Sequence, residues 1–182
     1  MDDAARRVER EDGIVLEPLQ RIVDPDNFTP RLVSILSNAL VSRESSELRR
    51  RFGIGTNEWR VLSALATKPG SSATEVSEFL ILNPALISRS VSTLVKRDLV
   101  VLSDGPRGSR PMYLTRAGAH LHDAALPISL RGQEIVLRDF TQDEVALLNT
   151  MLRRMLLAAP SLQSEDRFVD EPAGQSEAAP RT

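Results

Sequence analysis

Hydroxyl and cationic side chains recur at helical spacing in the segment that follows Asn83. The apolar residues spaced for burial on one side of it are Ile87, Val91, Leu94 and Val95. The opposite side carries Ser88, Arg89, Ser92, Thr93 and Lys96. Arginine can donate two hydrogen bonds to guanine, hydroxyls reach bases or phosphates, and lysine neutralises phosphate. The pattern predicts a helix over 84–97 whose outer face contacts duplex DNA.

The alternative for this outer face is an ordinary solvated helix surface. Such surfaces prefer Glu and Lys, whereas no acidic residue occurs between Asn83 and Arg97. Charge is also segregated along the chain, whose net charge is −2. Residues 1–26 hold eight acidic residues and four arginines, and residues 161–182 hold five and two, so the part between them carries +5. Such an excess also arises by chance, but the acid-free helix favours DNA.

A turn rich in glycine and proline, 103–109, lies between two short β-rich runs, 99–102 and 111–114. Arg107 stands within this turn and Arg110 directly follows it. Exposed arginine on a slim loop suits insertion into a narrow minor groove. The alternative is a solvated turn with incidental charge. We predict a two-stranded wing, with Arg107 and Arg110 as further candidate DNA contacts.

The helices that position these residues are bounded by capping and stop signals. We expect a first helix from a Thr29 cap to Gly53, a second from Thr56 to about Lys68, and a third over 73–80 capped by Ser72. Pro127 interrupts a fifth helix, which is either one bent helix or two pieces, 116–126 and 128–139. Thr141 and Glu144 form a capping box for a sixth helix, which ends at Pro160.

Composition argues against several classes of site. The chain has no cysteine and two histidines, which argues against disulfides, thiolate ligands and a structural zinc ion. It has no GxSxG motif, no phosphate-binding loop and no metal-spaced set of His, Asp and Glu, so we expect no enzyme activity, metal or cofactor. No run of eighteen apolar residues occurs, and the N-terminus lacks the apolar stretch of a signal peptide. We expect a cytoplasmic protein without a membrane partner.

The chain resembles the MarR family of transcriptional regulators over a core from Gly55 to Gly118. The segments that carry the resemblance are TNEWRVL at 56–62, SATEV at 72–76, PALISRSVSTLVKRDLV at 84–100 and LTRAG at 114–118. The flanking helices, over 28–159, fit more loosely. The resemblance implies that helix 84–97 enters the major groove and that the wing, 103–110, touches the minor groove or phosphates. Ser72 and Thr74, at the start of the third helix, complete the candidate DNA contacts.

The resemblance also implies a homodimer with intertwined helices 29–52 and 116–159. Two-fold symmetry then predicts a pseudo-palindromic operator in double-stranded DNA. Many family members are repressors that are released by a small molecule, often an aromatic acid. The residues on segments that border the family's ligand pocket are Ser34, Trp59, Arg60, His120 and His122. A lone histidine at such a place is more often a solvated or core side chain, so this alternative stays open.

Three features depart from the family pattern. Asp104 precedes Arg107 by three residues where the family commonly has Asp-x-Arg, which puts their pairing in doubt. Leu80–Ile81–Leu82 replaces the usual glycine of the helix-turn-helix turn, so the turn geometry is expected to differ. Pro127 interrupts a helix that is often continuous.

The predicted fold is mainly α (α+β), a winged helix-turn-helix with a two-stranded wing and flanking dimerisation helices. The predicted divisions are a partly disordered arm at 1–27, a dimerisation helix at 28–55, the DNA-binding domain at 56–115, C-terminal dimerisation helices at 116–160 and a disordered acidic tail at 161–182. The predicted function is a sequence-specific DNA-binding transcriptional regulator, a repressor that is released by a small ligand such as an aromatic acid or its thioester. The alternative is a winged-helix module that binds protein instead of DNA.

Overall fold

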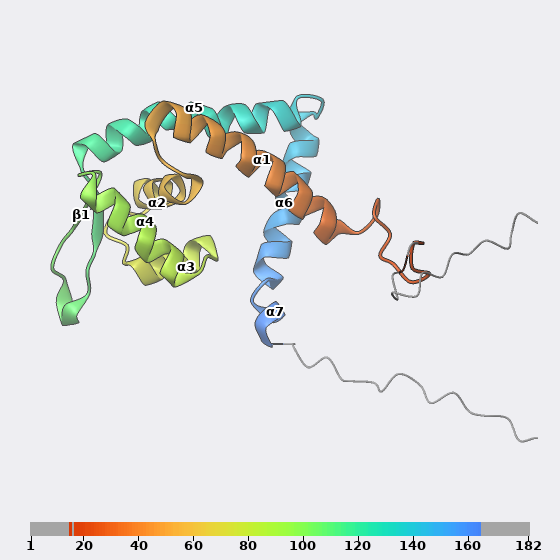
Figure 1. Ribbon diagram of the computed structural model, residues 1–182, viewed down its shortest axis with the longest axis horizontal. Helices are drawn as coiled ribbons and strands as arrows, with labels where there is room; N and C mark the ends of the chain where they lie inside the picture. Colours follow the sequence, from red (N-terminus) through yellow and green to blue (C-terminus); the bar gives the residue numbers. More distant parts are fainter. Residues whose placement is uncertain (1–14, 16, 165–182) are drawn as a thin grey trace, which may run out of the picture. The chain divides into compact units, whose positions relative to one another are not determined.

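The computed structural model describes residue 15 and residues 17–164 (Figure 1). Most of the predicted arm and acidic tail lie outside these residues. The helices are α1 (Thr29–Phe52), α2 (Thr56–Thr67), α3 (Ala73–Leu80), α4 (Pro84–Lys96), α5 (Arg116–Leu137), α6 (Gln142–Ala158) and α7 (Ser161–Ser164). The strands are β1 (Val100–Leu102) and β2 (Met112–Leu114), with a 3-10 turn, η1 (Pro106–Gly108), between them. The predicted mainly helical winged fold is confirmed.

The chain forms two compact units, one ending at Ser129 and one beginning at Leu130, and each is described by itself. Among the residues that the structure describes, no helix is both long and apolar enough to cross a membrane.

Helix α1 ends where glycine permits a left-handed backbone. Gly53 has φ +62°, and its N–H donates to the Arg49 carbonyl at 3.0 Å. Three arginines, 49–51, occupy the last turn, where cations favour the helix dipole. The expected cap at Thr29 was wrong: Phe28 holds the cap position without a side-chain bond, and Thr29 is already helical. Pro30 follows within the first turn, where its missing N–H has no helical partner to lose.

Helices α2, α3 and α4 pack around one apolar core. Each contributes side chains that are essentially inaccessible to water, and burying one such side chain stabilises the fold by roughly 1.5–3 kcal/mol. The buried side chains include Leu62 and Leu65 of α2, Val76 of α3, Ile87 and Leu94 of α4, Leu48 of α1, Val100 of β1 and Met112 of β2. The core therefore fixes α4 against two neighbouring helices and the base of the wing.

The turn between α3 and α4 keeps a left-handed residue although it contains no glycine. Ile81 has φ +51°, and its N–H donates to the Glu78 carbonyl at 3.2 Å. The N–H of Leu82 donates to the Ser77 carbonyl at 3.0 Å, and the buried Ser77 hydroxyl donates to the Leu82 carbonyl at 2.6 Å. Left-handed backbone is a genuine outlier for a β-branched residue. The turn therefore places strain on Ile81.

The wing is an antiparallel hairpin anchored at its base. Val100 lies opposite Leu114, and Leu102 lies opposite Met112. Both backbone groups of Met112 also bond to the loop after α2, because its carbonyl accepts from Gly70 N–H at 2.9 Å and its N–H donates to the Ser71 carbonyl at 3.1 Å. The hairpin is thereby tied to the helical core along β2.

Helix α5 is continuous through Pro127, so the single helix is observed instead of two pieces. Within the first unit it is tied to α1, since Arg43 Nη1 donates to the Ile128 carbonyl at 3.0 Å and Ser129 Oγ donates to Glu44 Oε1 at 2.6 Å. The predicted capping box opens α6: Glu144 N–H donates to Thr141 Oγ1 at 3.3 Å. Residues Ser161–Ser164 form one helical turn, which differs from the disorder expected from residue 161 onward.

Candidate nucleic-acid interface

Helix α4 has one buried face and one exposed face, as its sequence predicted. Asn83 caps the helix by accepting from Ala85 N–H at 2.8 Å. Ile87 and Leu94 are fully buried, and the small Ser90 is buried beside them. The five candidate DNA contacts on this helix are all exposed: Ser88, Arg89, Ser92, Thr93 and Lys96. The core thus fixes the direction in which this polar face points.

Two hydroxyls on the exposed face bond to the helix itself. Ser92 Oγ donates to the Ser88 carbonyl at 2.8 Å, and Thr93 Oγ1 donates to the Arg89 carbonyl at 3.1 Å. This back-bonding to the carbonyl four residues earlier is common for Ser and Thr within helices. It directs each hydroxyl proton inward along the helix and leaves the oxygen lone pairs toward solvent.

The cations Arg89 and Lys96 of α4 and Arg97, which directly follows it, have different surroundings. Within the described residues, neither Arg89 nor Lys96 forms an ion pair, so both keep their charge available. Arg97 instead turns toward α1, where Nη1 donates to the Gly53 carbonyl at 2.8 Å and Nη2 to the Phe52 carbonyl at 2.9 Å. Arg97 therefore satisfies carbonyls at the negative end of α1.

The start of α3 is held by a complete capping box. Glu75 N–H donates to Ser72 Oγ at 3.3 Å, and Ser72 N–H donates to Glu75 Oε2 at 2.8 Å. The Ser72 hydroxyl also donates to that carboxylate at 3.0 Å, and Lys68 Nζ lies 3.0 Å from Glu75 Oε1. The Ser72 N–H and then the Lys68 ammonium lower the pKa of Glu75 to about 2. Ser72 is thus engaged structurally, whereas Thr74 is exposed.

The wing tip is a tight, internally bonded turn. Gly105 N–H donates to the Ser109 carbonyl at 3.0 Å, and Ser109 N–H donates to the Pro106 carbonyl at 3.1 Å. Arg110 is exposed beside this turn. The side chain of Arg107 lies outside the described part of the structure, so the prediction for it and for its pairing with Asp104 stays a prediction.

The predicted ligand residues do not all meet. Trp59 and His122 stack, with ring centroids 5.2 Å apart and planes 22° apart. Trp59 is buried, and His122 Nδ1 lies 3.1 Å from Asp123 Oδ1. Arg60 is half-buried, while Ser34 and His120 are exposed. The structure therefore brings together one aromatic pair and leaves Ser34 and His120 on the surface.

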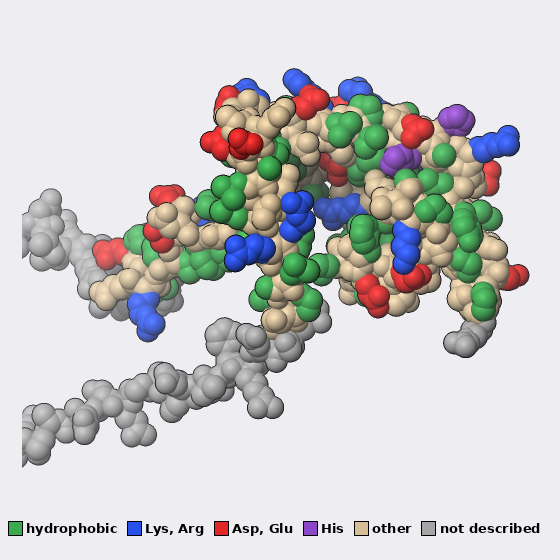
Figure 2. All heavy atoms as spheres, turned by 180° about the vertical axis from the view of Figure 1, so that it is seen from behind, with side chains coloured by type: hydrophobic (Ala, Val, Ile, Leu, Met, Phe, Trp, Pro, Cys, Tyr) green, Lys and Arg blue, Asp and Glu red, His purple; other side chains and the backbone are tan. Residues whose placement is uncertain are grey.

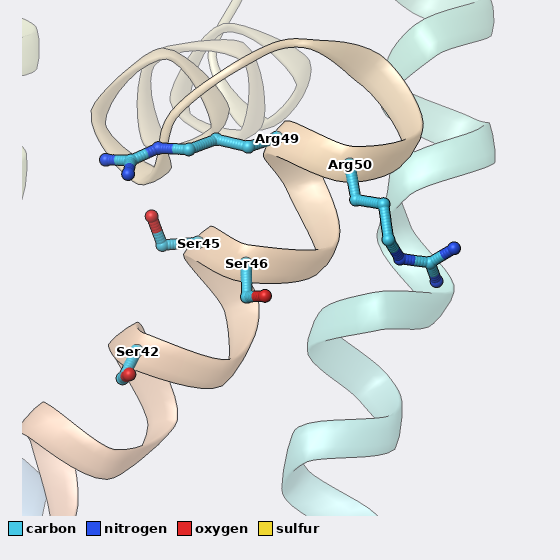
Figure 3. A pocket seen from close by; sticks show the side chains of 5 residues that line it. All are labelled: Ser42, Ser45, Ser46, Arg49 and Arg50. Carbon is cyan, nitrogen blue, oxygen red and sulfur yellow. The ribbon is translucent and has the colours of Figure 1, made fainter.

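A hollow on α1 was not foreseen from the sequence (Figure 3). Its volume is about 560 Å³, and the described residues that line it are Ser42, Ser45, Ser46, Arg49 and Arg50. Figure 3 shows that the two arginine side chains leave the helix in opposite directions. Arg50 Nη2 lies 2.8 Å from Glu47 Oε2, whereas Arg49 forms no ion pair within the described residues. Serines and arginines at spacings of three and four were the sequence signal that could have revealed it.

Residues 52–111 match the model of the MarR family. A comparison with curated protein sequences gives no match. Solved structures with the same fold include a MarR/EmrR family transcriptional regulator from Acinetobacter sp. ADP1, at 24% identity and a TM-score of 0.71, over 76% of this chain and 99% of that chain.

A MarR family regulator from Silicibacter pomeroyi is 22% identical, with a TM-score of 0.69, over 74% of this chain and 91% of that chain. The transcriptional regulator PcaV from Streptomyces coelicolor, solved with its natural ligand, is 25% identical, with a TM-score of 0.64, over 76% of this chain and 99% of that chain. The winged helix-turn-helix core therefore matches the MarR family model, and the chain shares its fold with these solved regulators.

Proposed function

We propose that the protein is a homodimeric, sequence-specific DNA-binding transcriptional regulator. The observation that carries this proposal is the outer face of α4, where the hydroxyls and cations of Ser88, Arg89, Ser92, Thr93 and Lys96 are all exposed and no acidic residue intervenes. The match of residues 52–111 to the MarR family model, and a fold shared with solved transcriptional regulators, support this proposal over an enzyme.

The exposed face of α4 fits the major groove of B-form DNA, which admits an α-helix. Arg89 presents a planar guanidinium that can donate two hydrogen bonds to guanine O6 and N7. Lys96 lies seven residues further along the helix and serves as a phosphate contact. Arg110 stands beside the wing tip, where the minor groove or its phosphates can be reached.

Exposed apolar side chains support dimerisation. The first half of α1 presents Leu32, Val33, Ile35 and Leu36, each between 41% and 49% exposed. In the second unit, α6 presents Leu147, Met151, Met155, Leu156 and Leu157. Hydrophobic side chains are correspondingly frequent on the face drawn in Figure 2. Large apolar surfaces of this kind mark association sites, and we assign them to a second copy of the chain, as in the intertwined dimer that the resemblance implies.

An anionic effector would release the repressor from its operator. The hollow on α1 supports an anion, because its described lining consists of serine hydroxyls and arginine side chains without a carboxylate. Arg49 is the better anchor, since Arg50 already bonds to Glu47. The predicted effector class is a small aromatic acid or its thioester.

Selection of bound duplexes from a random DNA pool tests the DNA-binding function. We expect enrichment of an inverted repeat whose half-sites lie about one helical turn apart, bound by two copies of the chain. Binding should weaken steeply as salt rises, because phosphate contacts release counterions. The alternative, a winged-helix module that binds protein, would be supported by two results. The pool would show no enriched duplex, and the immobilised protein would retain a protein partner equally with and without added DNA.

Thermal unfolding with added ligands tests the effector function. Aromatic carboxylates and their coenzyme A thioesters should raise the melting temperature of the dimer. Arg49→Ala should abolish that rise, while the matched Arg50→Ala variant should keep it. A rise that is equal in both variants would place the ligand elsewhere, and no rise with any acid tested would contradict the proposed effector class.

A further inference from the structure

We infer that Ser92 and Thr93 accept hydrogen bonds from exocyclic amino groups of bases, so that each half-site combines a guanine contacted by Arg89 with an adenine N6 or cytosine N4 within two base pairs of it. This inference rests on the proposed DNA-binding function and specifies which base groups α4 contacts. It concerns the polarity of the hydroxyls, which side-chain type alone does not determine, since a hydroxyl can donate or accept.

The bonds inside α4 set that polarity. Ser92 Oγ already donates to the Ser88 carbonyl at 2.8 Å, and Thr93 Oγ1 already donates to the Arg89 carbonyl at 3.1 Å. Each hydroxyl has a single proton. Donating it to DNA would break the bond within the helix, whereas accepting a hydrogen bond from DNA keeps that bond intact. Both oxygens therefore present themselves outward as acceptors.

The groups that duplex DNA offers to an acceptor are few. In the major groove only adenine N6 and cytosine N4 donate, whereas guanine O6 and N7, adenine N7 and thymine O4 accept. Phosphate oxygens also only accept, so they repel the lone pairs of these hydroxyls. Amino groups of bases are thus the matching partners of Ser92 and Thr93.

Arg89 has the opposite polarity on the same face. Its guanidinium carries five donors and no acceptor, so it matches guanine O6 and N7. Arg89 and Thr93 lie four residues apart, hence on the same row of the helix and about 6 Å apart along its axis. That spacing is close to two base-pair steps, so the donor and the acceptors on α4 reach bases within two base pairs of each other.

Base analogues that lack one amino group test the inference on the duplex selected from the random pool. Each adenine is replaced by purine and each cytosine by 2-pyrimidinone, symmetrically in both half-sites and at one position at a time. We expect one or two positions where the full-length protein loses about three- to tenfold in affinity per hydrogen bond. Ser92→Ala and Thr93→Val should bind the unmodified duplex more weakly and lose little more at these positions.

Thr67→Val is the matched control, because the exposed Thr67 hydroxyl also donates to the carbonyl four residues earlier, that of Ser63 at 2.9 Å, but lies on α2 outside the candidate DNA contacts. It should keep the wild-type response to the missing amino groups. Melting temperatures of all variants confirm folding, and the salt dependence of binding should be unchanged in Ser92→Ala, since no phosphate contact is lost.

If the protein binds selectively but every analogue weakens wild type and the Ser92→Ala and Thr93→Val variants equally, the amino-group assignment is overturned. The proposed DNA-binding function would then still stand. A reduced salt dependence in both variants would overturn the amino-group assignment too, since it would indicate phosphate contacts. Failure of the pool to yield any selective duplex would overturn the DNA-binding function and this inference together.

Discussion

Gly118, in the first turn of α5, lies directly against the backbone carbonyl of Leu99, so closely that no Cβ fits between them. The neighbouring Thr115 hydroxyl donates to the Asp98 carbonyl at 2.7 Å and accepts from Gly118 N–H at 3.0 Å. The LTRAG segment thus ties the start of α5 to the chain that leaves α4. This contact holds the base of the wing against α4.

Gly118→Ala should therefore destabilise the fold by about 3 kcal/mol or more, because the obstructing atom is backbone and cannot rotate away. Gly53→Ala is the control: Gly53 has φ +62° but nothing within 4 Å of a Cβ, so only the left-handed backbone is penalised, by about 1–2 kcal/mol. Urea unfolding of both variants measures the difference. An equal loss in the two would show that close approach at Leu99 is unimportant.

Lys96 and Arg97 are adjacent cations for which we predict different effects on substitution. Lys96→Ala should reduce the slope of log affinity against log salt by about 1 and leave the melting temperature nearly unchanged. Arg97→Ala should lower the free energy of unfolding by about 1–3 kcal/mol, since the Phe52 and Gly53 carbonyls lose a charged donor. The two measurements should separate the two variants, and a shared salt effect would place Arg97 on DNA as well.

Arg89→Ala should weaken sequence discrimination more than overall binding. Loss of a two-bond contact to guanine costs about 1–3 kcal/mol of preference for the correct base. Competition between the selected duplex and a scrambled duplex measures this preference, with Lys96→Ala as the variant that should weaken both duplexes alike. Equal loss of preference in the two variants would contradict the assignment of Arg89 to a base.

Local signals were sufficient to predict most of the fold. Asn83 and Thr141 cap α4 and α6 through their own side chains, as their residue types and positions predicted. The Thr29 cap was misassigned because a proline directly after a threonine can stand at either of the first two helical positions. The course of the chain at Pro127 was left open, because tertiary packing decides whether a helix bends or breaks at proline.

Spacing along one helix predicted the exposed face of α4, but sites assembled from several segments were harder to infer. The exposed positions on α4 follow from helical periodicity. The stacking of Trp59 on His122 depends on how α2 meets α5, and periodicity within either helix does not determine it. The hollow beside Arg49 was missed because a serine-rich helix face also fits a solvated surface.

Acid should weaken the α3 capping box. Folding lowers the pKa of Glu75 from its ordinary value of 4.5 to about 2, first through the Ser72 N–H and then through Lys68. The unfolded state therefore binds this proton more readily, so the stabilisation is present above about pH 4.5 and is lost as the pH falls toward 2.

Glu75→Gln should consequently lower the melting temperature at pH 6, and its difference from wild type should shrink between pH 4.5 and pH 2. Glu78→Gln is the control on the same helix, because its carboxylate makes no hydrogen bond in the described residues. A difference between Glu75→Gln and wild type that persists at pH 2 would show that the carboxylate charge is not what stabilises the helix.

The left-handed conformation of Ile81 predicts a stabilising substitution. A β-branched residue at φ +51° is strained, whereas glycine adopts this backbone freely. The Ile81 side chain is 63% exposed, so little burial is lost by removing it. The left-handed penalty of about 1–2 kcal/mol exceeds the added chain entropy of glycine, about 0.5–1 kcal/mol. Ile81→Gly should therefore raise the free energy of unfolding by roughly 0.5–1 kcal/mol, measured by urea denaturation. Ile81→Val, which keeps the β-branch, should give no gain, and a gain in both variants would trace the effect to lost apolar exposure instead of backbone strain.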